Sequence, residues 1–194
     1  MKTSSKTKII TTSSLLIAMA TVLSFIKVWN MPWGGSVTLM SMVPITVISF
    51  KYGVRRGLFC GFVYSLIQLA IGIAVDGLLG WGLTAGMLAS CVFLDYIFAF
   101  TILGIAGIFV KKGLWGIISG SALAVFLRFC SHVLSGVYVF ASAGKLWDGF
   151  ETSNTWLYSI VYNGVYMLPE LILTVLGIYI LFKAPKTAEF LLKE

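Results

Sequence analysis

The chain has 194 residues, of which 59% are hydrophobic and 11% are charged. A soluble domain carries roughly 25% charged residues, so this composition excludes an ordinary soluble fold and predicts a protein that spans the lipid bilayer. The formal net charge of +7 does not indicate nucleic-acid binding, because the basic residues cluster at the ends of apolar segments, where such residues set the orientation of membrane helices.

The apolar segments are long enough for six transmembrane helices, since each crossing needs about 20 residues. We expect one membrane domain over residues 1–194, with an all-α fold. Its predicted helices cover residues 9–28, 37–50, 58–75, 87–110, 114–141 and 156–182. The second helix is short and contains Pro44, which favours a kink or a tilt. The glycine-rich connection over residues 76–86 is expected to have little regular structure.

The basic residues also predict the orientation of the chain. With the N-terminus in the cytoplasm and six crossings, both termini and nearly all Lys and Arg residues lie on the cytoplasmic side, which satisfies the positive-inside rule. The residues concerned are Lys2, Lys6, Lys8, Lys51, Arg55, Arg56, Lys111, Lys112, Lys183, Lys186 and Lys193. An odd number of crossings would place one of these basic clusters outside. A bacterial plasma membrane is the expected location.

Polar side chains inside three predicted helices form a candidate site. Such groups are costly in hydrocarbon unless they are paired or line a polar cavity. From the rise of a helix, Asp95, His132 and Asn163 each lie roughly 10–13 Å below the outer end of their helix. We therefore expect a carboxylate, an imidazole and a carboxamide at one level in the outer leaflet, forming a substrate-binding pocket.

Arg128 and Glu170 fall deeper, near the middle of the membrane. Arg128 lies four residues before His132, on the same face of its helix. We expect a structural ion pair between Arg128 and Glu170 that fastens the last two helices beneath the pocket. The alternative is that one of the two contacts the ligand directly.

Aromatic side chains surround the predicted pocket level. Aromatic faces combined with one carboxylate can recognise a flat organic cation through stacking and cation–π attraction. For each ring, the alternative is a lipid-facing or interfacial position. The rings assigned to the pocket are Trp33, Tyr64, Tyr96, Phe140 and Tyr158.

The sequence contains no phosphate-binding loop, no GxSxG or HExxH motif and only one histidine, so we expect neither an enzyme nor a metal or cofactor site. The three cysteines, Cys60, Cys91 and Cys130, lie in apolar segments without metal-ligand spacing and are expected to be inert. In the first helix, Ser14 and Ala18 form a small-residue pair that permits close helix contact. That contact could be with a partner protein or within the chain.

Three segments resemble a known family: MPWGGSVTLMSMVPI (31–45), FLDYIFAFTILGIAGIF (93–109) and YNGVYMLPE (162–170). They resemble the thiamine-specific substrate-binding subunit, or S component, of energy-coupling factor transporters, the ThiT/YuaJ type. The resemblance implies a six-helix bundle that captures thiamine from outside. It also implies docking onto a transmembrane coupling subunit that carries two cytoplasmic ATPase subunits.

The resemblance also assigns individual residues. The family's pocket acid falls on Asp95, where some members carry Glu, and Tyr96 follows it. The remaining positions that the resemblance assigns to thiamine are His132, Tyr158, Asn163, Phe140, Tyr64 and, near the helix 2 aromatic position, Trp33. The family's docking motif falls on Ser14 and Ala18. Residues 76–86 depart most from the family pattern.

Two other functions stay open at this point. The same scaffold could bind a different vitamin, although an anionic one would need a positively charged pocket, contrary to Asp95. Alternatively, the chain could be a stand-alone transporter coupled to protons, with Asp95 and His132 as the relay.

Overall fold

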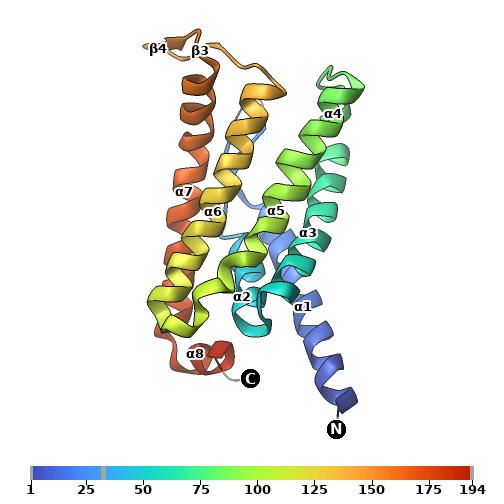
Figure 1. Ribbon diagram of the computed structural model, residues 1–194, viewed down its shortest axis with the longest axis vertical. Coiled ribbons are helices and arrows are strands. Elements are labelled where there is room, and N and C mark those ends of the chain that lie inside the picture. Colours follow the sequence, from blue (N-terminus) through green and yellow to red (C-terminus); the bar gives the residue numbers. More distant parts are fainter. Residues whose placement is uncertain (1, 32–33, 193–194) are drawn as a thin grey trace.

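The computed structural model describes residues 2–31 and 34–192 as a bundle of long helices with small hairpins toward one end (Figure 1). Within those residues, four helical segments are long and apolar enough to cross a membrane. These segments are Lys6–Phe25, Val54–Ala74, Ala85–Tyr138 and Thr155–Lys183. The third has 54 residues and reverses direction at Gly113, whose φ of +67° favours glycine. It therefore forms two neighbouring rods.

The helical elements follow the order of the predicted helices, with one addition at the end. They are α1 (Lys2–Phe25), α2 (Val43–Tyr52), α3 (Val54–Ala74), α4 (Ala85–Cys91), the π-helix η2 (Val92–Phe98), α5 (Ala99–Thr101), the 3₁₀-helix η3 (Ile102–Lys112), α6 (Gly113–Tyr138), α7 (Thr155–Lys183) and α8 (Pro185–Leu192). The helices predicted over 58–75, 114–141 and 156–182 correspond to α3, α6 and α7. Six membrane crossings stay a prediction, because α2 has only 10 residues.

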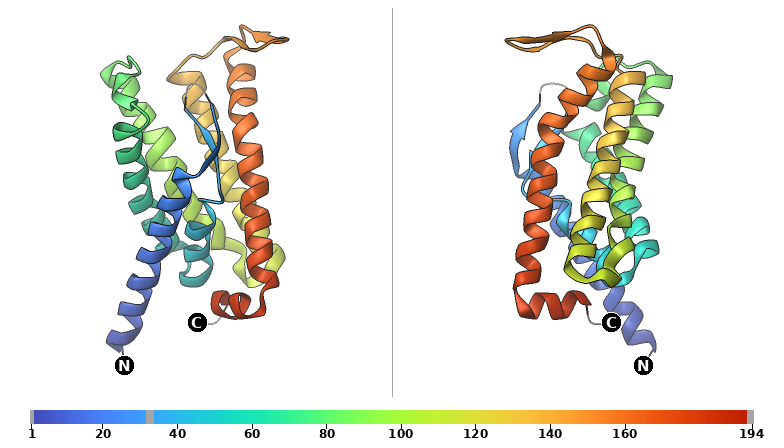
Figure 2. Two further views of the ribbon diagram at one scale, coloured as in Figure 1. Left: turned by 180° about the vertical axis from the view of Figure 1, so that it is seen from behind. Right: turned by 60° about the vertical axis from the view of Figure 1, so that its left-hand side comes forward.

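The prediction of a purely helical chain was wrong between α1 and α2. There the chain forms an antiparallel hairpin of β1 (Lys27–Asn30) and β2 (Ser36–Thr38). The predicted helix 9–28 therefore ends at Phe25, and the predicted helix 37–50 begins only at Val43. The turn contains Gly34 and Gly35, with φ of +87° and +84°, values that glycine adopts without strain. Figure 2 shows this hairpin lying between α1 and α7.

Two further elements lie at opposite ends of the bundle. A second hairpin, β3 (Gly144–Trp147) and β4 (Phe150–Thr152), joins α6 to α7. The rings of Trp147 and Phe150 stack across it with centroids 5.1 Å apart. At the other end, α8 turns across the base of the bundle after α7 (Figure 1). The connection over 76–86 holds a short 3₁₀-helix, η1 (Leu78–Gly80).

The helix predicted over residues 87–110 is one rod whose winding changes along its length. It begins as α4, widens into the π-helix η2, returns to α-helix in α5 and tightens into η3. Asp95 lies inside the π-helical part. Wide turns of this kind often occur at functional sites, because they change the direction of individual side chains.

The chain packs closely around α2, whose residues from Val43 to Phe50 are all buried. Ser49 donates from Oγ to the Gly104 carbonyl at 2.5 Å and accepts from the Gly107 amide at 2.9 Å. Gly57 and Gly104 lie backbone to backbone, with no room for a side chain at either position. Small residues thus allow α2, α3 and η3 to pack closely at one end of the bundle, while the other end holds a cavity.

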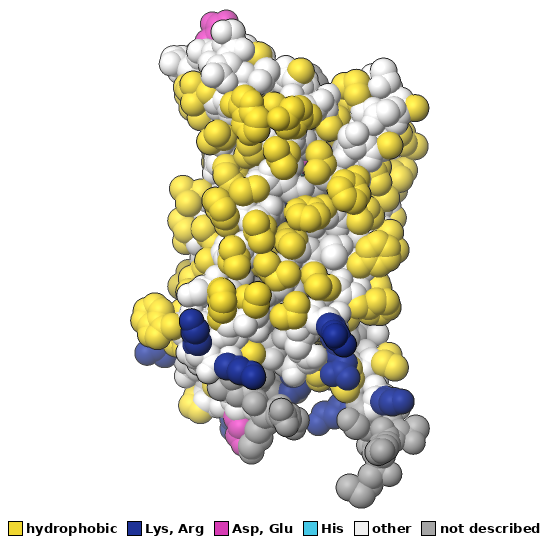
Figure 3. Space-filling view, viewed as in Figure 1, with side chains coloured by type: hydrophobic (Ala, Val, Ile, Leu, Met, Phe, Trp, Pro, Cys, Tyr) yellow, Lys and Arg dark blue, Asp and Glu magenta, His cyan; other side chains and the backbone are white. Residues whose placement is uncertain are grey.

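Charge is distributed unevenly along the bundle. Figure 3 shows Lys and Arg side chains gathered toward one end, below a wide apolar band. The described start of α1 and the helix α8 lie at that same end (Figure 1). This arrangement is what the positive-inside rule requires of a chain with both ends in the cytoplasm, and the orientation itself stays a prediction.

Candidate ligand-binding site

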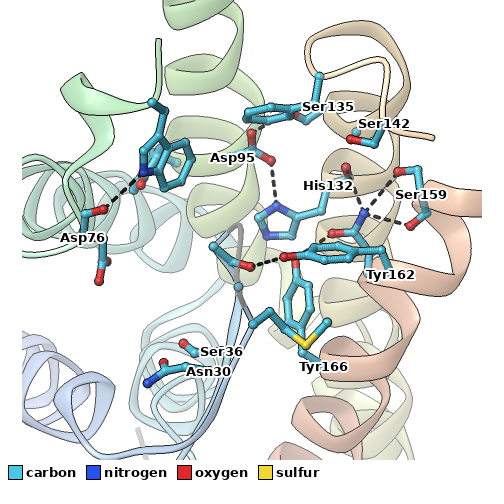
Figure 4. Close-up of a pocket in the computed structure, with 18 of the residues that line it drawn as sticks. Asn30, Ser36, Asp76, Asp95, His132, Ser135, Ser142, Ser159, Tyr162 and Tyr166 are labelled. Carbon is cyan, nitrogen blue, oxygen red and sulfur yellow. Dashed lines mark hydrogen bonds and ion pairs between the residues drawn. The ribbon is translucent and has the colours of Figure 1, made fainter. Parts of the chain in front are cut away.

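A cavity of about 1050 Å³ lies in the half of the bundle away from the basic end. Its size is at the upper limit of small-molecule pockets, which measure about 300–1,000 Å³. Its walls come from α3, η2, α6, α7 and the β1–β2 hairpin, and its rim from the connections that precede α4 and follow α6. Figure 4 shows that polar and aromatic side chains from these elements point into one space.

Asp95 and His132 lie at the centre of this cavity. Asp95 Oδ1 is 2.8 Å from His132 Nδ1, and the other carboxylate oxygen accepts a hydrogen bond from the Ser135 hydroxyl (Figure 4). Both side chains are mostly buried, with exposed fractions of 17% and 10%. Asn163 Nδ2 is 3.3 Å from the His132 carbonyl. The structure thus brings together the three residues that were predicted to share one depth.

Helical spacing explains why α6 and α7 each place several polar side chains in the cavity. Arg128, His132 and Ser135 are spaced four and three residues apart, so they share the face of α6 that meets η2. The residues of α7 that face the cavity also recur every three or four positions. Its polar and aromatic members are Ser159, Tyr162, Asn163, Tyr166 and Glu170.

Asn163 is held entirely by protein groups. Its amide nitrogen donates to the Ser159 carbonyl at 2.9 Å and contacts the Ser159 hydroxyl at 3.1 Å. Its amide oxygen accepts from the Tyr166 hydroxyl at 2.7 Å. The Tyr166 ring in turn meets the His132 ring edge-on at 6.1 Å. Asn163 therefore positions the Tyr166 hydroxyl and contacts His132 only at its backbone carbonyl. Tyr166 lines the cavity and was not predicted from the sequence.

Aromatic rings form one wall of the cavity along α7. Tyr158 is 8% exposed, and its ring lies parallel to that of Tyr162, with centroids 6.2 Å apart. Tyr162 also donates from its hydroxyl to the Gly34 carbonyl at 2.8 Å, which ties the hairpin turn to α7. Tyr162 was not predicted, because one more aromatic residue in an apolar helix carries no distinct signal.

Phe140 and Trp81 form the wall near the rim. Their ring centroids are 6.2 Å apart, so Phe140 lies where an aromatic was expected and Trp81 adds a second ring. Trp81 Nε1 donates to the Asp76 carbonyl at 3.2 Å. Lys27 of β1 forms a 2.7 Å ion pair with the Asp76 side chain. These contacts join the 76–86 connection to the hairpin at the entrance.

The other predicted rings differ in their positions. Tyr64 is 0% exposed, donates to the Ala20 carbonyl at 3.3 Å and meets the Phe100 ring edge-on at 5.3 Å. Tyr64 also lines the cavity, and its role as a stacking surface for the ligand stays a prediction. Tyr96 lines the cavity beside Asp95, in space left by the absent side chain of Gly72. Trp33 lies outside the described residues.

The predicted ion pair between Arg128 and Glu170 is not formed. Arg128 Nε instead donates to His132 Nε2 at 3.2 Å, and its guanidinium lies 4.1 Å above the centre of the Phe100 ring. Glu170 Oε1 accepts from the backbone amide and hydroxyl of Thr38 at 2.5 and 2.6 Å. The unpredicted hairpin is the physical reason, since β2 carries Thr38 to Glu170. Both charged residues line the cavity.

Ser14 and Ala18 lie on the outside of α1, and both are exposed. Ile10 and Val22, one turn to either side, are 67% and 63% exposed. Only 17% of the α1 span is buried, compared with 33–39% of the other candidate spans. This face of α1 is therefore available to lipid or to another helix. Of the three cysteines, Cys60 and Cys91 are buried and Cys130 is half-buried, all as free thiols.

Residues 10–189 match the family model described as "Thiamine transporter protein (Thia_YuaJ)". The chain is 33% identical to the thiamine transporter ThiT of Bacillus subtilis (strain 168) over 195 residues, covering 93% of this chain and 92% of that protein. It is 24% identical to ThiT of Lacticaseibacillus paracasei over 153 residues, with 72% and 70% covered. The solved structure of ThiT from Listeria monocytogenes superimposes with a TM-score of 0.70 at 25% identity, covering 94% of this chain and 98% of that one.

Proposed function

This chain belongs to the thiamine transporter protein (Thia_YuaJ) family, and from that premise we propose that it binds thiamine in the cavity around Asp95. Thiamine joins an aminopyrimidine to a thiazolium ring that carries a positive charge. A site for it needs one anionic group, hydrogen-bond acceptors for the amino group, and aromatic surfaces for two flat rings.

The observation that carries this proposal is the position of Asp95 among aromatic rings in a mostly buried site. An ionised carboxylate has about four lone-pair directions, and two are used by His132 and Ser135. The remaining directions can accept hydrogen bonds from the aminopyrimidine, while the charge balances the thiazolium. Burial strengthens both effects, because little water competes.

The remaining lining residues then divide into two roles. Phe140 and Trp81 near the rim, and Tyr158 and Tyr162 on α7, offer ring surfaces for stacking. His132 orients the ligand beside Asp95. Asn163 acts through Tyr166, to which it is hydrogen-bonded.

Tryptophan fluorescence gives a direct test of ligand class, since Trp81 lines the cavity. Thiamine is expected to quench the emission of the purified protein in a saturable manner. Riboflavin, biotin and folate, which carry no positive charge, are the matched comparison ligands. Saturable binding of one of these vitamins and not of thiamine would refute the assignment.

For the energy source, we propose an energy-coupling factor module, in which a transmembrane coupling subunit and two cytoplasmic ATPases drive uptake. The exposed face of α1 supports this proposal, because Ser14 and Ala18 let another helix approach closely. Ala18→Trp should abolish ATP-dependent uptake in proteoliposomes containing the module, without changing thiamine affinity. Leu66→Trp, on an exposed position of α3, is the matched control.

One observation favours a second candidate, a stand-alone proton-coupled transporter. The Asp95–His132 pair, at 2.8 Å, has the composition of a proton relay. Uptake driven by a pH gradient in vesicles that contain this chain and no ATPase would support that candidate. The same result would contradict the coupling-module proposal.

A further inference from the structure

We infer that Arg128 is a positioning residue that fixes the His132 imidazole as the neutral, Nδ1-protonated tautomer, so that Asp95 keeps its negative charge for the ligand. The tautomer follows from the protein alone. The benefit to the ligand rests on the proposed function.

The guanidinium group of Arg128 determines which ring nitrogen of His132 carries the hydrogen. Arg Nε carries a hydrogen, has no acceptor capacity and stays protonated in proteins. It lies 3.2 Å from His132 Nε2, so that nitrogen must present its lone pair. A neutral imidazole with a lone pair on Nε2 carries its hydrogen on Nδ1. That hydrogen points to Asp95 Oδ1, 2.8 Å away, which therefore accepts.

The position of Arg128 is itself fixed by packing. Its guanidinium lies over the Phe100 ring with 4.1 Å to the centroid, a cation–π geometry. Arg128 and His132 are four residues apart on α6, so their side chains meet on one helix face. Stacking from one side and the helix backbone from the other hold Nε toward the imidazole.

The other groups around His132 agree with a neutral ring. Asp95 of η2 accepts a hydrogen bond from His132 Nδ1 through its Oδ1 atom. The second oxygen of Asp95 accepts a hydrogen bond from the hydroxyl of Ser135, which lies on α6. From α7, the Tyr166 ring edge lies against the imidazole at 6.1 Å, and Asn163 bonds to the His132 carbonyl and not to its ring. The carboxylate of α7, Glu170, accepts through Oε1 from the amide and hydroxyl of Thr38.

A neutral His132 matters for a cationic ligand. An imidazolium at this position would form an ion pair with Asp95 and neutralise the charge that the thiazolium needs. It would also place a like charge beside the ligand. Arg128 thus contributes to selectivity for cations although its own charge is positive, because its hydrogen bond occupies the site where a second proton would bind.

The test uses the fact that the chain contains a single histidine. Protein prepared without a histidine tag and labelled with histidine that carries ¹⁵N only in the imidazole ring gives just the two ring signals of His132. At neutral pH and without ligand, we expect a protonated Nδ1 and an unprotonated Nε2, assigned by their couplings to the ring carbon hydrogens. A protonated Nε2, or two protonated nitrogens, would overturn the inference.

Variants separate positioning from general structure. Arg128→Met should produce a measurable Nε2-protonated population, and thiamine affinity should fall in proportion to the fraction of His132 that loses the Nδ1 hydrogen. Arg128→Lys, which can still donate, should restore most of the tautomer. Arg55→Met, at the basic end, should leave the spectrum unchanged. An Arg128→Met spectrum identical to that of wild type would contradict the inference, and failure of thiamine to bind would count against the proposed function alone.

Discussion

The replacement Asp95→Asn removes one negative charge from the site while preserving the shape of the side chain. Its structural effect should be small, because the asparagine oxygen can accept from His132 Nδ1. The Ser135 hydroxyl can then reverse and accept from the new amide nitrogen. If thiamine binds as proposed, the variant loses the charge opposite the thiazolium and the charge-assisted hydrogen bond to the amino group.

The magnitude follows from the burial of the site. With 17% of the Asp95 side chain exposed, a ligand that covers it leaves little solvent screening. Hydrogen bonds to charged groups contribute about 1.5–3 kcal/mol, so Kd should rise by a factor of about 10 to 150. Asp95→Glu keeps the charge with a longer reach and should bind more tightly than Asp95→Asn.

Isothermal titration calorimetry of the purified protein with thiamine measures this effect. Asp148→Asn is the matched control, because the Asp148 side chain is 99% exposed on the β3–β4 hairpin. Thermal unfolding of both variants separates a binding defect from a folding defect. A Kd for Asp95→Asn within twofold of wild type would refute the role assigned to this carboxylate.

Three further variants test other contacts. Tyr162→Phe removes the hydrogen bond that ties the hairpin turn to α7 at the Gly34 carbonyl, a contact that contributes about 1 kcal/mol. Stopped-flow fluorescence should then show thiamine leaving about fivefold faster, and an unchanged dissociation rate would show that this hydrogen bond does not help to retain the ligand. Thr38→Val removes the hydroxyl that donates to the buried Glu170 carboxylate and should lower the free energy of unfolding by about 1–3 kcal/mol. The expected sign is a lower unfolding temperature in detergent, and an equal or higher temperature would show that this contact is not stabilising. Ala18→Trp should abolish partner-driven uptake with thiamine affinity intact, and normal uptake would exclude this face of α1 as the docking surface.

The long helices could be predicted from the sequence because hydrophobic runs of about 20 residues have few alternatives. The β1–β2 hairpin could not be recognised in the same way. Val28 and Val37 are apolar, so they continued the neighbouring apolar runs and were assigned to helices. The available signal was the Gly34–Gly35 pair between β-branched and aromatic residues, which is typical of a hairpin turn.

In the site, the depth of each residue along its helix predicted which side chains line the same part of the cavity. It did not predict which of them form hydrogen bonds with one another. Asp95 and His132 were predicted at one level and are in contact. Arg128 and Glu170 were also predicted at one level, but each has a different partner. Spacing along a helix predicts the depth of a residue and the side of the helix on which it lies. Its hydrogen-bond partner also depends on neighbouring elements, and here the hairpin residue Thr38 bonds to Glu170.

The central claim is that the cavity around Asp95 holds thiamine. Native mass spectrometry of the protein, gently purified from bacteria grown with thiamine, tests it most directly. We expect one bound molecule per chain with the mass of thiamine, and its loss in Asp95→Asn. A chain that carries a different vitamin, or that carries thiamine equally well without the Asp95 carboxylate, would contradict the account.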